Sequence, residues 1–91
     1  MLNIKTFFVM EIYYTYILRS LRDLKNYYGH TKNLDERLAA HNSKKVRSTK
    51  ARVPFELIYF EEFNTKSEAY HQELFFKSKE GKIYLREKNV I

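Results

Sequence analysis

Two runs of aromatic and β-branched residues near the start of the chain constrain its fold more than any other feature. The first is Glu11–Ser20, EIYYTYILRS, and the second is Asn26–His30, NYYGH. Such residues favour strands, because their side chains pack well on a pleated surface. Only the polar stretch Leu21–Lys25 separates the runs, which suits a turn and is too short for a crossover helix. The two runs therefore predict an antiparallel hairpin.

A capping signal predicts a helix directly after the hairpin. Asn33 is followed three residues later by Glu36, which is the spacing of an N-terminal capping box. Leu34 and Leu38 stand one turn apart and mark the buried stripe of this helix. The segment Ser43–Val53 then lacks any apolar period and is expected to be a loop.

A third strand and a second helix follow the loop. Phe55–Glu62, FELIYFEE, has the composition of a strand. Thr65 with Glu68 three residues later repeats the capping pattern. We expect the helix to end at Ser78 or Glu80, before Gly81, because glycine commonly follows a helix C-terminus. Lys82–Lys88 is expected to form one more short helix.

The resulting order, β-β-α-β-α-α, is that of an α+β fold with a small three-stranded antiparallel sheet flanked by helices. A chain of 91 residues has room for one core of two packed layers. We expect residues 10–91 to form a single domain. Residues 1–9 precede a second methionine at position 10 and are expected to be an amino-terminal extension of unknown role.

Composition excludes several classes of protein. The chain has no cysteine, which removes disulfides, thiolate zinc sites and a cysteine nucleophile. It contains no apolar stretch of the roughly 18 residues that a membrane-spanning helix needs, so no membrane partner is expected. No secretion signal is visible, and the expected location is the cytoplasm.

Charge and aromatic content favour a nucleic-acid partner. The chain carries 17 Lys+Arg against 11 Asp+Glu, a net charge of +6, together with eight Tyr and seven Phe. Cations contact phosphates, and aromatic rings stack on bases. A soluble β-rich protein with an ordinary charged surface is the alternative. One acid-free stretch has the composition of a phosphate-contacting loop, and its basic residues are Lys44, Lys45, Arg47, Lys50 and Arg52.

The first helix is expected to place two candidate residues beside the core. At 100° per residue, His41 shares the face of Leu34 and Leu38, and Arg37 lies on its flank. A guanidinium at the border between core and surface can hold a phosphate with a planar fork of donors. The alternative is an arginine whose stem packs along the helix while its head is solvated.

The second helix carries a carboxylate on its apolar side. Ala69, Tyr70 and Phe76 define that side, and Glu73 falls among them. A buried carboxylate is costly unless it is paired or binds a metal. Glu73 is therefore a candidate metal ligand, the alternative being a structural partner such as Arg37 or a tyrosine hydroxyl.

The hairpin concentrates phenols. Tyr14 and Tyr16 share one face of the first strand, and Tyr27 lies on its partner. Each is an ordinary strand residue if taken alone. If they lie beside Arg37 and Glu73, they are candidate general bases, because a nearby positive charge favours the ionised form of a phenol.

These residues together resemble the GIY-YIG nuclease superfamily. Its two name motifs appear in altered form as Tyr14-Thr15-Tyr16 and Tyr27-Tyr28-Gly29, and Arg37 follows Tyr27 by ten residues. Ser67–Ser78 is similar to the family's metal-binding helix. The resemblance covers about residues 12–80. It is strongest to small free-standing members related to the amino-terminal nuclease domain of the excinuclease C subunit.

The resemblance implies a metal-dependent endonuclease that hydrolyses phosphodiester bonds in DNA, with RNA left open as a substrate. Glu73 would ligate Mg²⁺, for which Mn²⁺ can substitute. Tyr27 would activate the attacking water, and Tyr16 would orient that water or share the task. Arg37 would stabilise charge on the phosphate, and His41 would contact phosphate or assist proton transfer. The candidate catalytic set is thus Tyr16, Tyr27, Arg37, His41 and Glu73.

Two other functions remain open at this stage. The protein could be an inactive nucleic-acid-binding module of the same fold, which Tyr14 and Thr15 favour because they replace the motif's Gly and Ile. It could also be an interaction domain whose basic face meets an acidic protein, although that function leaves Glu73 unexplained. For a nuclease this small, selectivity for DNA structure is expected rather than for sequence.

Overall fold

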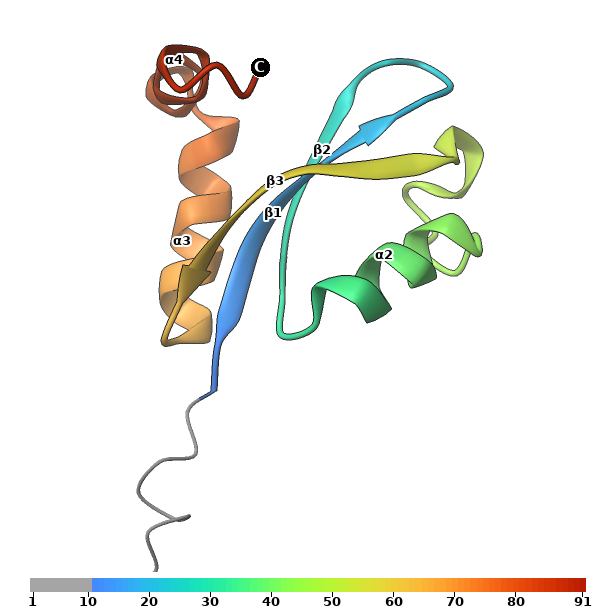
Figure 1. The fold of residues 1–91 in the computed structure, drawn as a ribbon, viewed down its shortest axis with the longest axis horizontal. Coiled ribbons are helices and arrows are strands. Elements are labelled where there is room, and N and C mark those ends of the chain that lie inside the picture. Colours follow the sequence, from blue (N-terminus) through green and yellow to red (C-terminus); the bar gives the residue numbers. More distant parts are fainter. Residues whose placement is uncertain (1–10) are drawn as a thin grey trace, which may run out of the picture.

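The structure is a computed structural model that describes residues 11–91; the expected extension over residues 1–9 lies outside this range. It confirms the α+β class and the order of elements (Figure 1). No helix within residues 11–91 is long and apolar enough to cross a membrane. The elements are β1 (Tyr13–Ser20), β2 (Asn26–Thr31), α2 (Leu34–Asn42), a 3-10 helix (Lys50–Arg52), β3 (Phe55–Phe63), α3 (Lys66–Lys77) and α4 (Lys79–Glu87).

The sheet has the strand order β2-β1-β3, and both pairs are antiparallel. Because side chains alternate along a strand, the central strand β1 supplies two cores on opposite faces. Tyr16 and Leu18 pack toward α2, whereas Ile17 packs with Phe76 of α3 and Leu85 of α4. Figure 1 shows the sheet passing between α2 on one side and α3 on the other. The sheet thus lies between the two helical layers (Figure 1).

Helix α2 begins where the capping signal predicted, with one difference. The Asn33 side chain accepts a hydrogen bond from the Glu36 backbone N–H at 3.0 Å. The Asn33 N–H donates to Thr31 Oγ1 at 3.2 Å, so Thr31 takes the place that the capping box assigns to the Glu36 side chain. At the other end, the Asn42 amide bonds both backbone groups of Phe55. These contacts fix α2 against both ends of the sheet.

The second helix ends within one residue of the expected Ser78, not at Glu80, and the last helix begins three residues before the expected Lys82. Helix α3 ends at Lys77, and α4 begins at Lys79 with Gly81 inside its first turn. Ser78 caps α4, because its hydroxyl accepts from the Gly81 N–H at 3.0 Å. A Cβ on Gly81 would lie 1.7 Å from the Phe75 carbonyl oxygen. Glycine is thus required for close packing of α4 onto the end of α3.

Candidate active site

Tyr16 lies at the centre of the site, on the face of β1 that α2 covers. Its side chain is buried, with an exposed fraction of 2%. Its hydroxyl lies 3.1 Å from His41 Nε2 and accepts from Arg37 Nε at 3.4 Å. The cross-strand neighbour of Tyr16 is Gly29, and a Cβ there would lie 2.5 Å from the Tyr16 hydroxyl. Glycine therefore makes room for this hydroxyl over β2, the edge strand.

His41 continues the network inward. It is fully buried, and its Nδ1 lies 2.8 Å from Thr49 Oγ1. The Thr49 hydroxyl donates to the Val46 carbonyl at 3.4 Å, so we assign it as acceptor of the Nδ1 proton. His41 Nε2 then accepts from the Tyr16 hydroxyl. With no exposed atom left for phosphate, His41 can act only by holding Tyr16 in place.

Of Tyr16, Arg37 and His41, only Arg37 is charged at neutral pH. Burial, and then the nearby Arg37 charge, lowers the pKa of His41 to about 4, so the imidazole is neutral. Burial raises the pKa of Tyr16, although the Arg37 hydrogen bond opposes this shift. The hydrogen bond to Tyr16 in turn raises the pKa of Arg37. The guanidinium is thus a permanent positive charge beside a protonated phenol.

We expect His41 to make the fold acid-sensitive. The histidine pKa is 6.5 in the unfolded reference and about 4 in the fold. Between these values the unfolded chain binds more protons, so acidification favours unfolding. The contribution of His41 is complete above pH 6.5 and is lost as the pH falls toward 4, a change on the order of 3 kcal/mol.

Thermal melts between pH 7.5 and 4 measure this effect. His41→Gln is expected to flatten the fall in Tm relative to the wild type. The matched substitution at the exposed His71 of α3 controls for the loss of one histidine as such. Equal slopes for wild type and His41→Gln would contradict the buried neutral state of His41.

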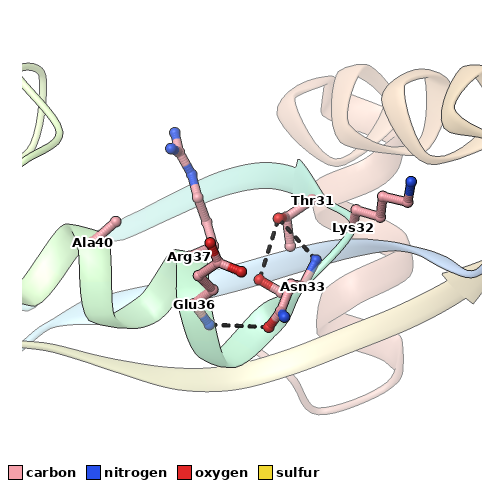
Figure 2. A pocket seen from close by; sticks show the side chains of 6 residues that line it. All are labelled: Thr31, Lys32, Asn33, Glu36, Arg37 and Ala40. Atoms are coloured by element: carbon pink, nitrogen blue, oxygen red, sulfur yellow. Dashed lines mark hydrogen bonds between the residues drawn. The ribbon is translucent and has the colours of Figure 1, made fainter.

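Tyr27 and Arg37 bring the network to the surface. Tyr27 pairs with Leu18 on the same face as Tyr16, and its ring centroid lies 4.9 Å from that of His41. It is half-buried and adds to the raised pKa of Arg37. Figure 2 shows the Arg37 side chain extending away from α2. It lines an open pocket of about 290 Å³ together with Thr31, Lys32, Asn33, Glu36 and Ala40.

Glu73 lies on the opposite face of the sheet and is buried as expected, with an exposed fraction of 9%. Glu73 is paired, as the structural alternative expected, but its partners are neither Arg37 nor a tyrosine hydroxyl: His30 Nδ1 contacts Oε1 at 2.8 Å and Lys77 Nζ contacts Oε2 at 2.7 Å. Burial raises the pKa of Glu73, but these two hydrogen bonds outweigh it and lower the pKa overall. The carboxylate is therefore ionised at neutral pH.

Tyr70 departs from its expected place on the buried side of α3. It is 44% exposed, and its ring lies edge-on to His30 with centroids 5.5 Å apart. The buried stripe of α3 consists of Ala69, Glu73 and Phe76. Tyr70 therefore covers His30 from outside and adds nothing to the core.

The two faces approach one another around β2. Thr15 donates to the Ala69 carbonyl at 2.7 Å, which anchors α3 against β1 close to Glu73. The Glu73 carboxylate is near enough to contribute to the raised pKa of Tyr16. Because β2 is an edge strand, one substrate can approach groups on both faces without passing through the sheet.

The loop between α2 and β3 places the five basic candidates unequally. Lys44, Lys45, Arg47 and Lys50 are exposed. Arg52 is half-buried and donates to Asp23 Oδ2 at 2.7 Å, which holds the β1–β2 turn. The predicted loop also contains the short 3-10 helix. Thr49 ties this loop to His41, so the exposed cations lie on a segment connected to the site.

Two residues of the site, Thr49 and Lys77, are not among those that the sequence predicts. Thr49 stands in a loop without periodicity, and nothing local predicts its contact with His41. Lys77 follows Glu73 by four residues, a spacing at which opposite charges pair on a helix. This spacing alone could have predicted that Lys77 pairs with Glu73.

Known proteins share this sequence pattern. The family described as the GIY-YIG catalytic domain matches residues 12–89. The UPF0213 protein of Bacillus licheniformis is 42% identical over 80 residues, covering 84% of this chain and 81% of the relative. That of Oceanobacillus iheyensis is 45% identical over 64 residues, covering 69% and 73%. The solution NMR structure of a UPF0213 protein from Bacillus halodurans is 34% identical, with a TM-score of 0.49 and coverage of 84% and 83%.

Proposed function

Because this chain belongs to the GIY-YIG family, we propose that it is a metal-dependent endonuclease that hydrolyses phosphodiester bonds in DNA. The family is one of nucleases, so its substrate class is nucleic acid. The observation that carries the proposal is the network of Arg37, Tyr16 and His41. It fixes a permanent cation at an open pocket, beside a half-buried phenol.

Arg37 supports the binding of a phosphate. Its Nε is occupied by the Tyr16 hydroxyl, while its outer end lies in the open pocket of Figure 2. A guanidinium presents a fixed fork of donors, which suits two oxygens of one phosphate. Because Tyr16 and His41 hold the fork in advance, it can stabilise charge that builds on those oxygens during hydrolysis.

Tyr27 is the more exposed of the two phenols beside Arg37. Tyr16 is only 2% exposed and its hydroxyl is engaged on both sides. Tyr27 is half-buried and lies beside the same guanidinium. We therefore assign water activation to Tyr27, and treat Tyr16 and His41 as positioning residues for Arg37.

Glu73 fits the role of ligand to Mg²⁺. Within residues 11–91 no group of three or more His, Asp or Glu side chains could hold a metal ion. Mg²⁺ does not need such a group, because it keeps several waters and binds through one or two carboxylates and substrate phosphates. Both oxygens of the ionised Glu73 are engaged, one by His30 and one by the half-exposed Lys77, so a bound ion would take the place of the Lys77 ammonium. The bound ion would supply positive charge to the reacting phosphate.

The exposed basic residues support selection of DNA by structure. Lys44, Lys45, Arg47 and Lys50 lie on one loop next to the site. Lysine and arginine contacts to phosphates position a nucleic acid and carry no sequence information. Selectivity for flaps, branches, nicks or single strands is therefore proposed.

Cleavage of a labelled panel tests this function. The substrates are supercoiled plasmid, intact duplex, single-stranded, nicked, flapped and branched DNA, and one RNA, each with Mg²⁺, Mn²⁺ or EDTA. We expect metal-dependent cutting that favours the non-duplex DNAs, and none with Arg37→Ala purified identically. Binding that weakens as salt rises, without any product, would instead favour the inactive binding module.

A further inference from the structure

A second hollow lies on the other side of the α2 N-terminus from the Arg37 pocket. Its volume is about 480 Å³, and it runs between α2 and β3. Its lining includes Tyr14, Lys32, Asn33, Asp35, Phe60 and Glu62. The proposed catalysis uses none of its aromatic residues.

An aromatic pair forms one wall of this groove. The rings of Tyr14 and Phe60 meet edge to face, with centroids 5.8 Å apart at 73°. Phe60 is 43% exposed and pairs in register with Tyr16, so the aromatic pair lies on the same sheet face as the catalytic network. Exposed aromatic rings in a nucleic-acid-binding protein are stacking surfaces for bases.

The charges of the groove suit a base better than a phosphate. Asp35 and Glu62 are both exposed at its wall. Their carboxylates repel phosphate and accept hydrogen bonds from the amino groups of adenine, cytosine or guanine. Arg37, in the neighbouring pocket, instead attracts phosphate. A nucleotide that spanned both hollows would therefore place its phosphate at Arg37 and its base at Phe60.

The two hollows are neighbours that share two lining residues. Lys32 and Asn33 line both of them, and Figure 2 shows Asn33 at the start of α2 and the Lys32 side chain directed away from that of Arg37. The Lys32 ion pair with Glu11 is exposed on both sides and so contributes little. Breaking this pair costs little, so Lys32 can exchange Glu11 for a phosphate bound next to the groove.

We propose that the groove between α2 and β3 binds one unpaired nucleobase next to the cleaved phosphate, stacked on Phe60 and Tyr14. This inference rests on the proposed nuclease function and specifies its substrate. A base in a duplex is stacked and paired, and it costs a few kcal/mol to extrude, whereas an unpaired base costs least. The groove therefore selects DNA with a bulged, flapped or single-stranded nucleotide at the cleavage point.

The test measures base stacking without cleavage. One DNA duplex carries a single bulged 2-aminopurine, and a second carries the same base paired with thymine. Each is titrated with the protein in EDTA, and 2-aminopurine fluorescence is recorded. We expect quenching and tighter binding for the bulged duplex only. Phe60→Ala is expected to reduce its affinity about 10-fold, within the range for one base stacked on an aromatic ring.

Two further variants separate stacking from folding. Phe60→Leu keeps an apolar side chain on β3 but removes the ring, and it is expected to lose the quenching. Ile83→Ala on α4, at a comparable exposed fraction of 45%, is expected to retain it. Thermal melts confirm that each variant is folded.

The outcomes distinguish the groove from the nuclease. Equal affinity for both duplexes, or quenching that persists in Phe60→Leu, would overturn base capture and leave the cleavage panel to decide the activity. Quenching lost in Phe60→Leu, with no cleavage of any substrate by the wild type, would support the groove and overturn the proposed nuclease.

Discussion

Glu73→Gln is expected to lower Mg²⁺-dependent cleavage about 1,000-fold, at the upper end of what one electrostatic contact contributes to a rate. The substitution keeps the shape of the side chain, and its amide oxygen can still face His30. It removes the negative charge that a hard cation requires. Initial rates at saturating DNA, over a series of Mg²⁺ concentrations, measure the loss.

The control for this prediction is Glu80→Gln, the same substitution at an exposed position of α4. It changes the net charge equally and is expected to leave the rate within about twofold, because surface substitutions away from a site have small effects. Thermal melts of both variants show whether the fold persists. A Glu73→Gln protein that cuts at the wild-type rate would eliminate Glu73 as the metal ligand.

Tyr27→Phe is expected to slow cleavage by about 100- to 1,000-fold, the usual contribution of a positioned proton acceptor. Tyr16→Phe is expected to cost less, about 10-fold, because its hydroxyl holds Arg37 and His41 and does not meet water. The same change leaves His41 Nε2 buried without a donor, which costs about 1–3 kcal/mol of stability. Tyr27→Phe should therefore have the lower cleavage rate, and Tyr16→Phe the lower Tm.

Single-turnover rates and thermal melts on the same preparations check this contrast. Tyr16→Phe is expected to melt lower and cut faster than Tyr27→Phe. The reverse order of cleavage rates would assign the water to Tyr16 and make Tyr27 the positioning residue. Phe63→Leu, at a half-buried position of β3, serves as an aromatic substitution outside the network.

Most of the fold follows from local signals. The hairpin arises from two strand-forming runs around a short turn, and both α2 and α3 begin at the residues that their caps predict. Gly81 escaped this reasoning because its role depends on a carbonyl of the preceding helix, Phe75. Local patterns cannot tell a glycine that ends a helix from one that admits a neighbouring helix.

The site was predictable only where periodicity governs it. The helical repeat put His41 on the buried face of α2 and Arg37 at its border, which the structure confirms. Tyr70 was assigned to the core of α3 by the same reasoning, but it lies against His30 at the surface. Contacts between elements, such as Thr49 with His41, have no periodic signature. Such contacts can be identified only from the three-dimensional structure.

A single substitution at Gly29 could weaken catalysis in this domain without affecting its binding of nucleic acid. Every amino acid reachable from a glycine codon by one base change carries a Cβ, and at this position that atom meets the Tyr16 hydroxyl. One point mutation would therefore disturb the hydroxyl that orients Arg37, while the exposed cations of the α2–β3 loop stay in place. Such a variant would cleave more slowly while it still bound nucleic acid, and the residue at this position would record the first step of that change.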